Sequence, residues 1–497
     1  MKEPTNRDAI MAGAGIGGLA AAIRLQCLGY QVHVLEKNAQ PGGKIGQFKQ
    51  DGFRFDTGPT LLTMPWLVDE LYELAGKSGE KIFDYKPLKE GTQYWFSDGT
   101  QISPGNEREA FINEVGQKTK EPQKTLRKFL DNSKTLYGLT APVFLERSLH
   151  DRANYFRLTT LKTLLRFPPL KLFRTMNREN RKTFSDSRVR QLFNRYATFN
   201  GSNPYQTPAV FNVIPHLEHN LGAYYPQGGM YSLVESLYQL AKSIGVSFSF
   251  NETIEAINLK DGRINEIQTK TGFSAKPRLI VSNIDAETTY RNLLPSEYYP
   301  SFYLNREKSS SALIFYWNIQ GDHPQLKLHN IFFANDYQEE FTKLFKEKDI
   351  PSDPTVYVYI SSKANPDDAE EGGENWYVMI NAPIDIGQEW DELRKKGRTF
   401  ITKKLSKDLG YDITPYILKE SYWSPKGIEN DTGSAYGALY GNSSNSQFSA
   451  FLRHPNYSPK IKGLYFCGGS VHPGGGIPLC LNSAKIVSDL VRRNINL

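Results

Sequence analysis

The glycine-rich turn GAGIGG, Gly13 to Gly18, limits the fold of this chain more than any other feature. A short apolar strand, 9–12, precedes the turn, and an alanine-rich helix, 19–28, follows it. The alternating strand YQVHVLEK comes next, and its Glu36 stands 18 residues after the last glycine. Strand, GxGxxG, helix, strand and acid in this order predict a βαβ unit that binds a dinucleotide. The chain is therefore expected to have a Rossmann-like α/β fold.

Each residue of this unit has its own predicted role. Gly13 permits the tight turn, Gly15 lets a pyrophosphate approach the backbone, and Gly18 allows the helix to pack closely on the strand. The free N–H groups at the start of the helix would face the phosphates. The carboxylate of Glu36 would accept hydrogen bonds from a ribose, and its negative charge disfavours a 2′-phosphate.

The stretch after Glu36 distinguishes between NAD and FAD. It contains a second glycine pair, Gly42 and Gly43, then Lys44, and continues as the loop-rich DGFRFDTGPTLLTMP from Asp51. A nicotinamide-binding domain normally continues into further βα units at this point. The loop-rich continuation therefore predicts FAD, enclosed within the protein.

Regular patterns return after an insertion in the middle of the chain. Apolar residues at helical spacing predict a helix over 233–244, and alternation predicts a strand over 246–250. Further alternating strands follow, with turns at 261–262 and 271–272. We interpret these elements as the rest of the nucleotide-binding layer. The aromatic, alternating stretch 309–423 predicts a second sheet, so the 497 residues are expected to form at least two structural units.

Positive charge is concentrated in one segment, 146–182, which holds ten Arg and Lys against three Asp and Glu. Its local excess of +7 equals the net charge of the whole chain. Leucines at helical spacing are interleaved with the basic residues, which predicts amphipathic helices that dock on an anionic membrane surface. An ordinary solvated surface is the alternative interpretation. No recognised nucleic-acid-binding module accompanies the charge, so nucleic acid is not an expected partner.

Cysteine usage and the N-terminus indicate the setting of the protein. Cys27, Cys467 and Cys480 form neither a disulfide framework nor a metal-ligand pattern, so a reducing environment and no metal are expected. Glu3 and Asp8 are unlike the basic start of a signal peptide, and no apolar run is long enough to span a bilayer. We expect a cytoplasmic protein that associates peripherally with the cytoplasmic membrane.

Motifs distributed over nearly the whole chain carry a family resemblance. They are GAGIGGLAAAIRL, LEKNAQPGGK, DGFRFDTGPTLLTMP, RYATFNGSNPYQTPA, YPQGGMYSL and GLYFCGGSVHPGGGIPLCLNSAKI. With them the chain resembles the FAD-dependent carotenoid desaturases of the bacterial phytoene-desaturase type, within the amine-oxidase-like flavoproteins. GPTLLTMP and VHPGGGIP together are typical of the carotenoid branch. The ending, with GSAYGALYG and FLRHPNYSP before it, is most similar to the 1-hydroxycarotenoid 3,4-desaturases.

The resemblance implies two interleaved domains. Residues 1–90, 221–282 and 455–497 would form the FAD-binding domain. Residues 91–220 and 283–454 would form a substrate-binding domain of mixed sheet and helices, with the membrane-docking helices at about 146–182.

The resemblance also implies where FAD would be bound. Gly13, Ala14, Gly15 and Gly18 would line the pyrophosphate, Glu36 and Lys37 the adenosine ribose, and Ile254 the adenine. Gly43 and Lys44 would lie near the phosphates and ribityl, and Gly58, Pro59 and Thr60 beside the flavin ring. Gly469, Ser470, Ile477 and Pro478 would reach ribityl and isoalloxazine. Many relatives place an Asp in this late motif, where the present chain has Gly468, Gly469 and Ser470.

The reaction implied by the resemblance is a step of carotenoid biosynthesis in which FAD removes two hydrogens from a polyene. The expected substrate is a 1-hydroxycarotenoid, acyclic or monocyclic, desaturated at carbons 3 and 4. Because the conjugated polyene stabilises positive charge itself, the protein would mainly position the substrate and exclude water. No acid–base constellation is expected, and the sequence assigns no catalytic residue. His472 is the one candidate acid or base, but a turn-forming role before Pro473 is favoured.

Several alternatives share these motifs. They are a phytoene or dehydrosqualene desaturase, an oxygenase of diapocarotenoid terminal methyl groups and a redox-neutral polyene isomerase. A prenyl-binding escort protein is the alternative without catalysis. The sequence leaves the electron acceptor, oxygen or a quinone, undetermined.

Overall fold

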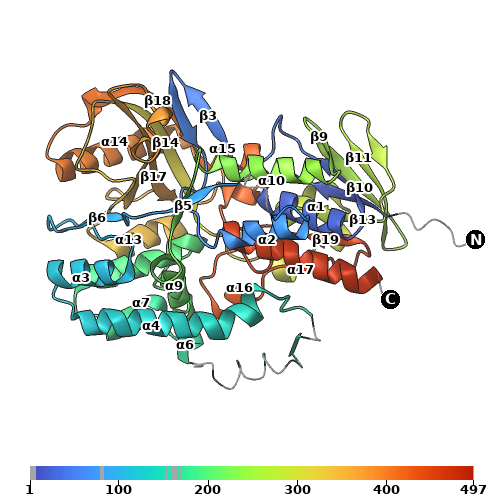
Figure 1. Cartoon of the computed structure of the whole chain (residues 1–497), viewed down its shortest axis with the longest axis horizontal. Helices are drawn as coiled ribbons and strands as arrows, with labels where there is room; N and C mark the ends of the chain where they lie inside the picture. Colours follow the sequence, from blue (N-terminus) through green and yellow to red (C-terminus); the bar gives the residue numbers. More distant parts are fainter. Residues whose placement is uncertain are drawn as a thin grey trace, which may run out of the picture.

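The computed structural model describes residues 7–78, 83–151, 154–155, 157, 160, 163, 166 and 170–495. A parallel sheet of five strands carries the predicted dinucleotide-binding unit (Figure 1). Its order is β19-β13-β1-β2-β9, with bounds Leu464–Phe466, Leu279–Ser282, Asp8–Ala12, Gln31–Leu35 and Ser247–Ser249. In β1, Ala9 and Met11 belong to one hydrophobic core, and Ile10 and Ala12 belong to another. Both faces of the sheet are covered, which is why DAIMA is apolar at successive positions.

Helix α1, Ile16–Cys27, begins three residues earlier than the sequence predicts. Gly17 and Gly18 belong to its first turn, and these two positions are glycine because a larger residue would not fit there. A Cβ on Gly18 would lie 2.3 Å from the carbonyl oxygen of Gly13, and one on Gly17 would lie 3.2 Å from Cα of Gly468. The helix therefore packs directly against the glycine turn.

Helices cover one face of the parallel sheet, and a small antiparallel sheet covers the other. Helices α1, α10 (Tyr231–Ser243) and α17 (Ile477–Ile495) lie side by side in the first core (Figure 1). Strands β10 (Ile254–Lys260), β11 (Arg263–Thr269) and β12 (Ser274–Ala275) and helix α11 (Ala286–Leu293) form the opposite layer. The turns predicted at 261–262 and 271–272 connect these strands and are confirmed.

A second, mixed sheet contains seven strands. Its order is β18-β14-β17-β16-β15-β6-β7, with bounds Ile417–Trp423, Ser311–Gln320, Gly373–Ala382, Val356–Ile360, His329–Phe332, Gln93–Trp95 and Gln101–Ile102. The sheet predicted over 309–423 is confirmed, but β6 and β7 come from a stretch for which no strand was predicted. Helix α14, Trp390–Leu409, packs with Phe315, Trp317 and Val378 on one face. On the other face, Tyr316 and Tyr377 pack with Phe53 and Phe55 in a separate hydrophobic core.

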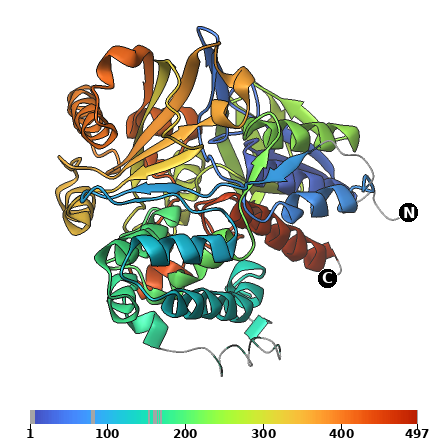
Figure 2. The ribbon, with the colours of Figure 1, turned by 60° about the vertical axis from the view of Figure 1, so that its left-hand side comes forward.

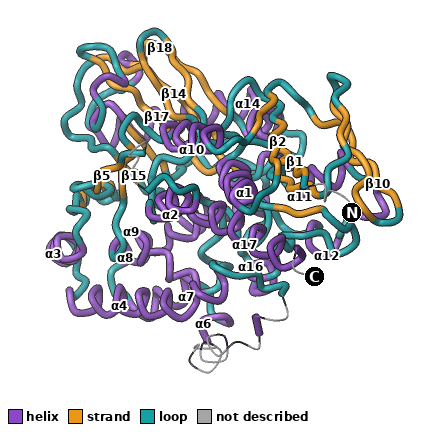
Figure 3. Tube along the Cα trace, turned by 45° about the vertical axis from the view of Figure 1, so that its right-hand side comes forward, coloured by secondary structure: helices purple, strands orange, loops and turns teal. Residues whose placement is uncertain are grey.

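A layer of helices lies beside this sheet, in the lower part of Figures 2 and 3. It contains α3 (Arg108–Lys118), α4 (Gln123–Thr140), α6 (Leu170–Phe173), α7 (Met176–Thr183), α8 (Ser187–Asn194) and α9 (Ile214–His219). Phe129, Phe184 and Phe193 pack together at its centre, with ring centroids 4.5 to 4.9 Å apart. Among the described residues, the remaining α-helices and strands are β3 (Gln47–Gln50), β4 (Phe53–Asp56), α2 (Trp66–Leu74), β5 (Tyr85–Pro87), β8 (Tyr224–Pro226), α12 (Ser301–Leu304), α13 (Tyr337–Thr342), α15 (Pro425–Thr432) and α16 (Gln447–Phe451).

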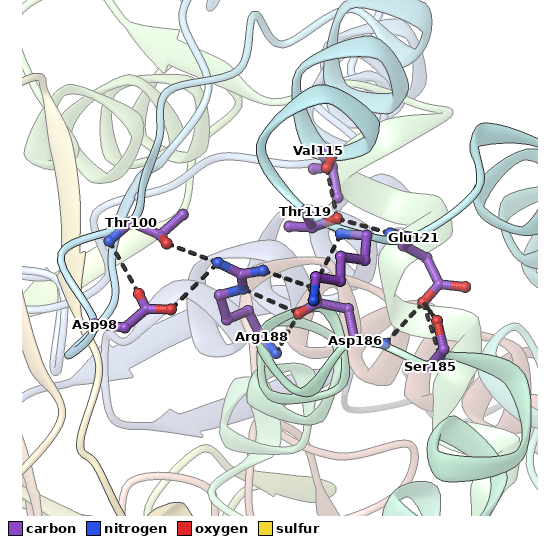
Figure 4. Close-up of polar contacts among 9 residues, drawn as sticks. Asp98, Thr100, Val115, Thr119, Glu121, Ser185, Asp186 and Arg188 are labelled. Carbon is purple, nitrogen blue, oxygen red and sulfur yellow. Dashed lines mark hydrogen bonds and ion pairs between the residues drawn. The ribbon is translucent and has the colours of Figure 1, made fainter.

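Asp186 and Arg188 form a polar cluster between the helical layer and the seven-stranded sheet (Figure 4). The Asp186 carboxylate caps α8 by accepting a hydrogen bond from the Arg188 N–H at 2.9 Å, and it accepts another from the Lys120 N–H at 3.0 Å. The Arg188 guanidinium donates to Asp186 at 2.7 and 3.0 Å and to Thr100 at 2.7 Å. Asp186 thus joins the start of α8 to the α3–α4 connection, and its partner Arg188 extends the link to the β6–β7 turn.

Replacing Asp186 with asparagine is expected to lower the free energy of unfolding by about 1–3 kcal/mol at pH 7, because charged hydrogen bonds are lost. Partial burial acts to raise the pKa of Asp186, but Arg188 and the Lys120 N–H lower it below its usual value. Since the folded-state pKa is depressed, the contribution is present above the unfolded pKa of about 4 and is lost as the pH falls. Urea denaturation at pH 7 and pH 3 measures both effects.

The matched control is Asp98→Asn, which removes an exposed partner of the same Arg188 guanidinium. Its expected effect is below about 0.5 kcal/mol, as for most exposed ion pairs. Equal losses in the two variants, or a loss at Asp186 that does not shrink at low pH, would contradict the prediction.

Candidate functional site

A cavity of about 950 Å³ lies between the parallel sheet and the inner face of the seven-stranded sheet. Its first wall is formed by residues at the carboxyl ends of the parallel strands, where α/β proteins place their ligands: Gly13, Glu36, Asn283 and Gly468. Its second wall is formed by residues of β14 to β17: Ile314, His329, Ile331, Tyr357, Tyr377 and Met379. One wall is suited to a nucleotide and the other is largely apolar and aromatic.

Most of the predicted site residues line this one cavity. They are Gly13, Gly15, Glu36, Lys37, Gly43, Lys44, Gly58, Pro59, Thr60, Ile254, Gly469, Ser470, Ile477 and Pro478. Ala14 and Gly18 lie behind the lining: the Ala14 N–H donates to Glu36, and Gly18 packs on Gly13. Segments distant in the sequence are therefore brought together. The contacts that each residue would make with FAD remain predictions.

Glu36 is held rigidly at the end of β2. It is 5% exposed, and its two carboxylate oxygens accept hydrogen bonds from the Ala14 N–H at 2.7 Å and the Asn38 N–H at 2.9 Å. A carboxylate has lone pairs left for further donors, such as the hydroxyls of a ribose. Lys37 instead donates to the backbone oxygen of Asn430 at 2.5 Å, so this lysine holds α15 against the end of the strand.

The start of α1 fits a pyrophosphate. Gly15 occupies the N-cap position without a side-chain cap, and the first turn contains no acidic residue. The first N–H groups of the helix therefore stay available to an anion. Gly43 approaches this turn so closely that a Cβ on it would lie 3.4 Å from Cα of Gly15. Open amides, a cradle of glycines and a fixed carboxylate together form a donor and acceptor set that fits FAD.

Asn283 joins the two glycine-rich motifs, a role that the sequence analysis missed. A Cβ on Gly15 would lie 2.6 Å from its Oδ1, and a Cβ on Gly468 would lie 2.6 Å from its Nδ2. The Asn283 Nδ2 also donates to the backbone oxygen of Cys467 at 3.2 Å. Gly468 of the late motif is thus required for packing against the Asn283 side chain as well as for access to the cavity. The available signal was the position of Asn283 directly after the buried strand β13.

A half-buried acid lies in the cavity although the late motif lacks one. Asp285 lines the cavity and caps α11 by accepting a hydrogen bond from the Glu287 N–H at 2.9 Å. Burial raises its pKa, and the nearby Lys308 and Lys44 act in the opposite direction. Ser470, from the late motif, accepts a hydrogen bond from the Ala286 N–H at 3.0 Å. The start of α11 therefore supplies the carboxylate that the motif itself does not.

His472 does not contribute to the cavity. Its Nε2 is 2.7 Å from the backbone oxygen of Arg147, and the residue is 3% exposed. Burial lowers the pKa of His472 to about 3, so the ring is neutral at physiological pH. These contacts agree with the structural role that the sequence favoured over acid–base chemistry.

An ionised pair lies at the helical side of the cavity, and the sequence analysis did not single it out. Arg195 donates through Nη2 to Glu218 at 3.3 Å and to the Tyr94 hydroxyl at 3.1 Å. The Tyr196 hydroxyl donates to the same Glu218 oxygen at 3.0 Å. Burial acts to raise the pKa of Glu218, but Arg195 lowers it below its usual value. Both Arg195 and Glu218 line the cavity while remaining more than nine-tenths buried.

A short chain of hydrogen bonds crosses the cavity wall. The Thr60 hydroxyl is 2.7 Å from the Tyr357 hydroxyl, and the Tyr357 hydroxyl is 2.7 Å from Nδ1 of His329. All three residues line the cavity. Tyr357 and His329 come from the neighbouring strands β16 and β15, which sequence patterns alone could not place beside Thr60.

In the part of the chain that the structure describes, no cluster of three or more His, Cys, Asp or Glu side chains could hold a metal ion. The three cysteines are free.

Comparisons with known proteins agree with this geometry. The sequence model of the flavin-containing amine oxidoreductases matches residues 16–492. The chain is 47% identical to a 1-hydroxycarotenoid 3,4-desaturase of a Flavobacterium species, over 98% of this chain and 99% of that protein. It is 30% identical to a 4,4′-diapolycopene oxygenase of Methylomonas, over 99% of each. Among solved structures, a cyclohexylamine oxidase of Brevibacterium oxydans shares the fold, with a TM-score of 0.61 at 14% identity over 99% of this chain and 100% of that one.

Proposed function

The chain belongs to the family of flavin-containing amine oxidoreductases, and we propose on this premise that it desaturates carbons 3 and 4 of a 1-hydroxycarotenoid with FAD. The observation that carries the proposal is the 47% identity to such a desaturase over 98% of the chain. The family, the class of enzyme and the FAD cofactor that the sequence predicts are confirmed.

Some residues of the cavity would bind the cofactor, and others would bind the substrate. The α1 amides would bind the FAD pyrophosphate, and Glu36 would orient the adenosine ribose. When bound, FAD supplies the acceptor for the two hydrogens that the substrate loses. Ile331, Tyr377 and Met379, on the second wall, would hold the polyene and exclude water. Because a conjugated polyene delocalises positive charge over many carbons, this positioning is the main contribution required from the protein.

The experiment is incubation of the purified, FAD-loaded protein with defined polyenes, followed by mass spectrometry of the pigments. A desaturase removes two hydrogens from a 1-hydroxycarotenoid. Gain of oxygen would instead support the oxygenase activity named for the Methylomonas relative, and an unchanged mass with a changed absorption spectrum would indicate isomerisation. Conversion of phytoene or dehydrosqualene in preference to hydroxylated polyenes would move the assignment to an earlier desaturation step.

We also propose that the protein binds peripherally to the cytoplasmic membrane through the basic segment 146–182. Among the described residues, no helix has the length and apolar character needed to cross a bilayer. Tyr155 and Phe173 are 48% and 67% exposed, as expected of side chains that insert into a lipid interface. Several residues of the segment, including those at 152–153, 158–159, 161–162, 164–165 and 167–169, lie outside the described residues.

Some of the basic side chains of this segment are paired within the protein. Lys171 and Arg174 contact Glu179 at 2.7 and 3.4 Å, which reduces the charge that they offer to a lipid surface. Arg157 and Arg166 are exposed. These two arginines are therefore the better positions at which to test the proposal.

Replacing Arg157 and Arg166 together with glutamate is expected to reduce binding to phosphatidylglycerol vesicles by at least about tenfold, because each basic residue near an anionic surface contributes about 1 kcal/mol. Vesicle sedimentation at low and high salt measures the change. Lys395→Glu with Lys396→Glu, on exposed positions of α14 far from this segment in Figure 1, is the matched control. Equal binding by the two double variants would rule out docking through this segment.

A further inference from the structure

We infer that His329, Tyr357 and Thr60 form a binding site for the hydroxyl group of the polyene substrate, beside the carbons that lose hydrogen. This inference rests on the proposed function and deepens it, since it assigns residues that would distinguish a hydroxylated polyene from a hydrocarbon one. The site lies where β15, β16 and the loop after β4 meet at the cavity.

His329 has one ring nitrogen engaged and one without a partner. Its Nδ1 is 2.7 Å from the Tyr357 hydroxyl, whereas its Nε2 has no hydrogen-bond partner among the described residues. The residue is 3% exposed and lines the cavity. A buried polar atom without a partner is costly and uncommon in folded proteins. A ligand that presents a polar group to His329 would relieve that cost.

A hydroxyl group matches this nitrogen whichever tautomer the imidazole adopts. If Tyr357 donates to Nδ1, then Nε2 carries the proton and donates to the ligand. If Nδ1 donates to Tyr357, then Nε2 accepts, and a hydroxyl can donate to it. Burial lowers the pKa of His329 to about 4, so the ring is neutral and favours an uncharged partner over an anion. The Thr60 and Tyr357 hydroxyls hold the imidazole in place from the other side.

The position of the site agrees with the chemistry of the proposed substrate. In a 1-hydroxycarotenoid desaturated at carbons 3 and 4, the hydroxyl-bearing carbon is two bonds from the nearer reacting carbon. The hydroxyl must therefore lie close to the flavin ring whenever the reacting carbons do. Thr60 follows Gly58 and Pro59, the residues predicted to lie beside that ring. The neighbouring side chains Ile331 and Met379 are apolar, and the Tyr377 hydroxyl on this wall is already 3.6 Å from Sδ of Met379.

Arg195 is another cavity residue with an unpaired donor that could bond the substrate hydroxyl. Its Nε also has no hydrogen-bond partner among the described residues, and it lines the same cavity. Its guanidinium, however, already interacts with Glu218 and Tyr94, and it carries a full charge. The neutral His329, which is linked to Thr60 through the Tyr357 hydroxyl, is therefore the better match for a neutral alcohol.

The test compares a 1-hydroxylated polyene with the same polyene lacking the hydroxyl group, on FAD-loaded enzyme. Wild type is expected to prefer the hydroxylated substrate by about 100-fold or more in kcat/KM, since sites built to bond a hydroxyl reject analogues without one. His329→Phe is expected to reduce this preference at least about tenfold. Most of that loss should fall on the hydroxylated substrate, whereas the hydrocarbon is converted much as before. His329→Gln keeps a donor and an acceptor and should retain most of the preference.

Binding without turnover provides a second readout. Enzyme whose flavin has been reduced beforehand cannot oxidise the polyene, so quenching of tryptophan fluorescence reports the dissociation constant alone. His329→Phe should weaken binding of the hydroxylated polyene and leave that of the hydrocarbon unchanged. Tyr359→Phe is the matched control, because it removes a hydroxyl from β16 at a residue outside the cavity lining. The FAD absorption of each variant verifies that the protein has folded.

The outcomes separate the inference from the proposed function. If wild type desaturates neither polyene, the proposed function fails and the inference fails with it. If wild type desaturates both polyenes equally, or if His329→Phe keeps the full preference, the inference fails and the desaturase assignment stands. A preference lost in His329→Phe but kept in His329→Gln and Tyr359→Phe supports the site.

Discussion

Replacing Gly15 with alanine is expected to give a folded protein that binds FAD at least about 100-fold more weakly, equivalent to a loss of about 3 kcal/mol. The new Cβ would lie 2.6 Å from Oδ1 of Asn283 and would displace the side chain that joins the two glycine motifs. It would also occupy the surface on which a pyrophosphate must approach the helix amides. Flavin absorbance per protein after desalting measures the loss.

Gly138→Ala is the matched control for Gly15→Ala. Gly138 lies in α4, and a Cβ there would meet no heavy atom within 4 Å. This change is expected to leave FAD binding unaltered and to stabilise the helix by about 0.5–1 kcal/mol. If Gly15→Ala retained FAD as well as Gly138→Ala does, the pyrophosphate would have to be bound elsewhere.

Replacing Arg195 with methionine is expected to lower the free energy of unfolding by about 3–5 kcal/mol, because it leaves Glu218 buried without its charged partner. The side chains of Arg195 and Glu218 are 9% and 5% exposed. Tyr196 would remain as a hydrogen-bond donor to the carboxylate, but it carries no compensating charge. Chemical denaturation monitored by tryptophan fluorescence measures the change.

Two further variants isolate the cause of that loss. Arg195→Met combined with Glu218→Gln removes both charges and is expected to recover more than half of the lost stability. Arg127→Met breaks an ion pair with Glu109 whose side chains are 43% and 59% exposed, and it should cost less than about 1 kcal/mol. Similar losses in Arg195→Met and Arg127→Met would show that burial of the Arg195 pair has no special energetic role.

The nucleotide-binding half of the molecule could be predicted because its signals are local. A strand, a glycine turn and a helix are contiguous in the chain, and each glycine meets a steric need within a few residues. Even so, α1 begins earlier than predicted. The sequence pattern predicts that Gly17 and Gly18 belong to the turn, whereas their close contacts with Gly13 and Gly468 accompany their place in the first turn of the helix.

The second wall of the cavity could not be predicted residue by residue. Alternation over 309–423 indicates strands but contains no information on their order, and β15 pairs with β6 from a distant stretch. In the sequence, nothing distinguishes His329 and Tyr357 from the other residues of the aromatic, alternating stretch. Their neighbour Thr60 is separated from them by most of the chain, so no spacing rule connects the three.

The sequence by itself determined the fold class, the family and the cofactor, because these depend on motifs whose chemistry is complete within a short segment. Tertiary structure alone decided that Asn283 joins the two glycine-rich turns, that Asp285 supplies an acid to the cavity and that His472 lies outside its lining. It also linked His329, whose Nε2 has no hydrogen-bond partner among the described residues, to Thr60 through the Tyr357 hydroxyl. Such relations arise when distant segments pack together, and hydrogen bonds and burial are properties of that packing.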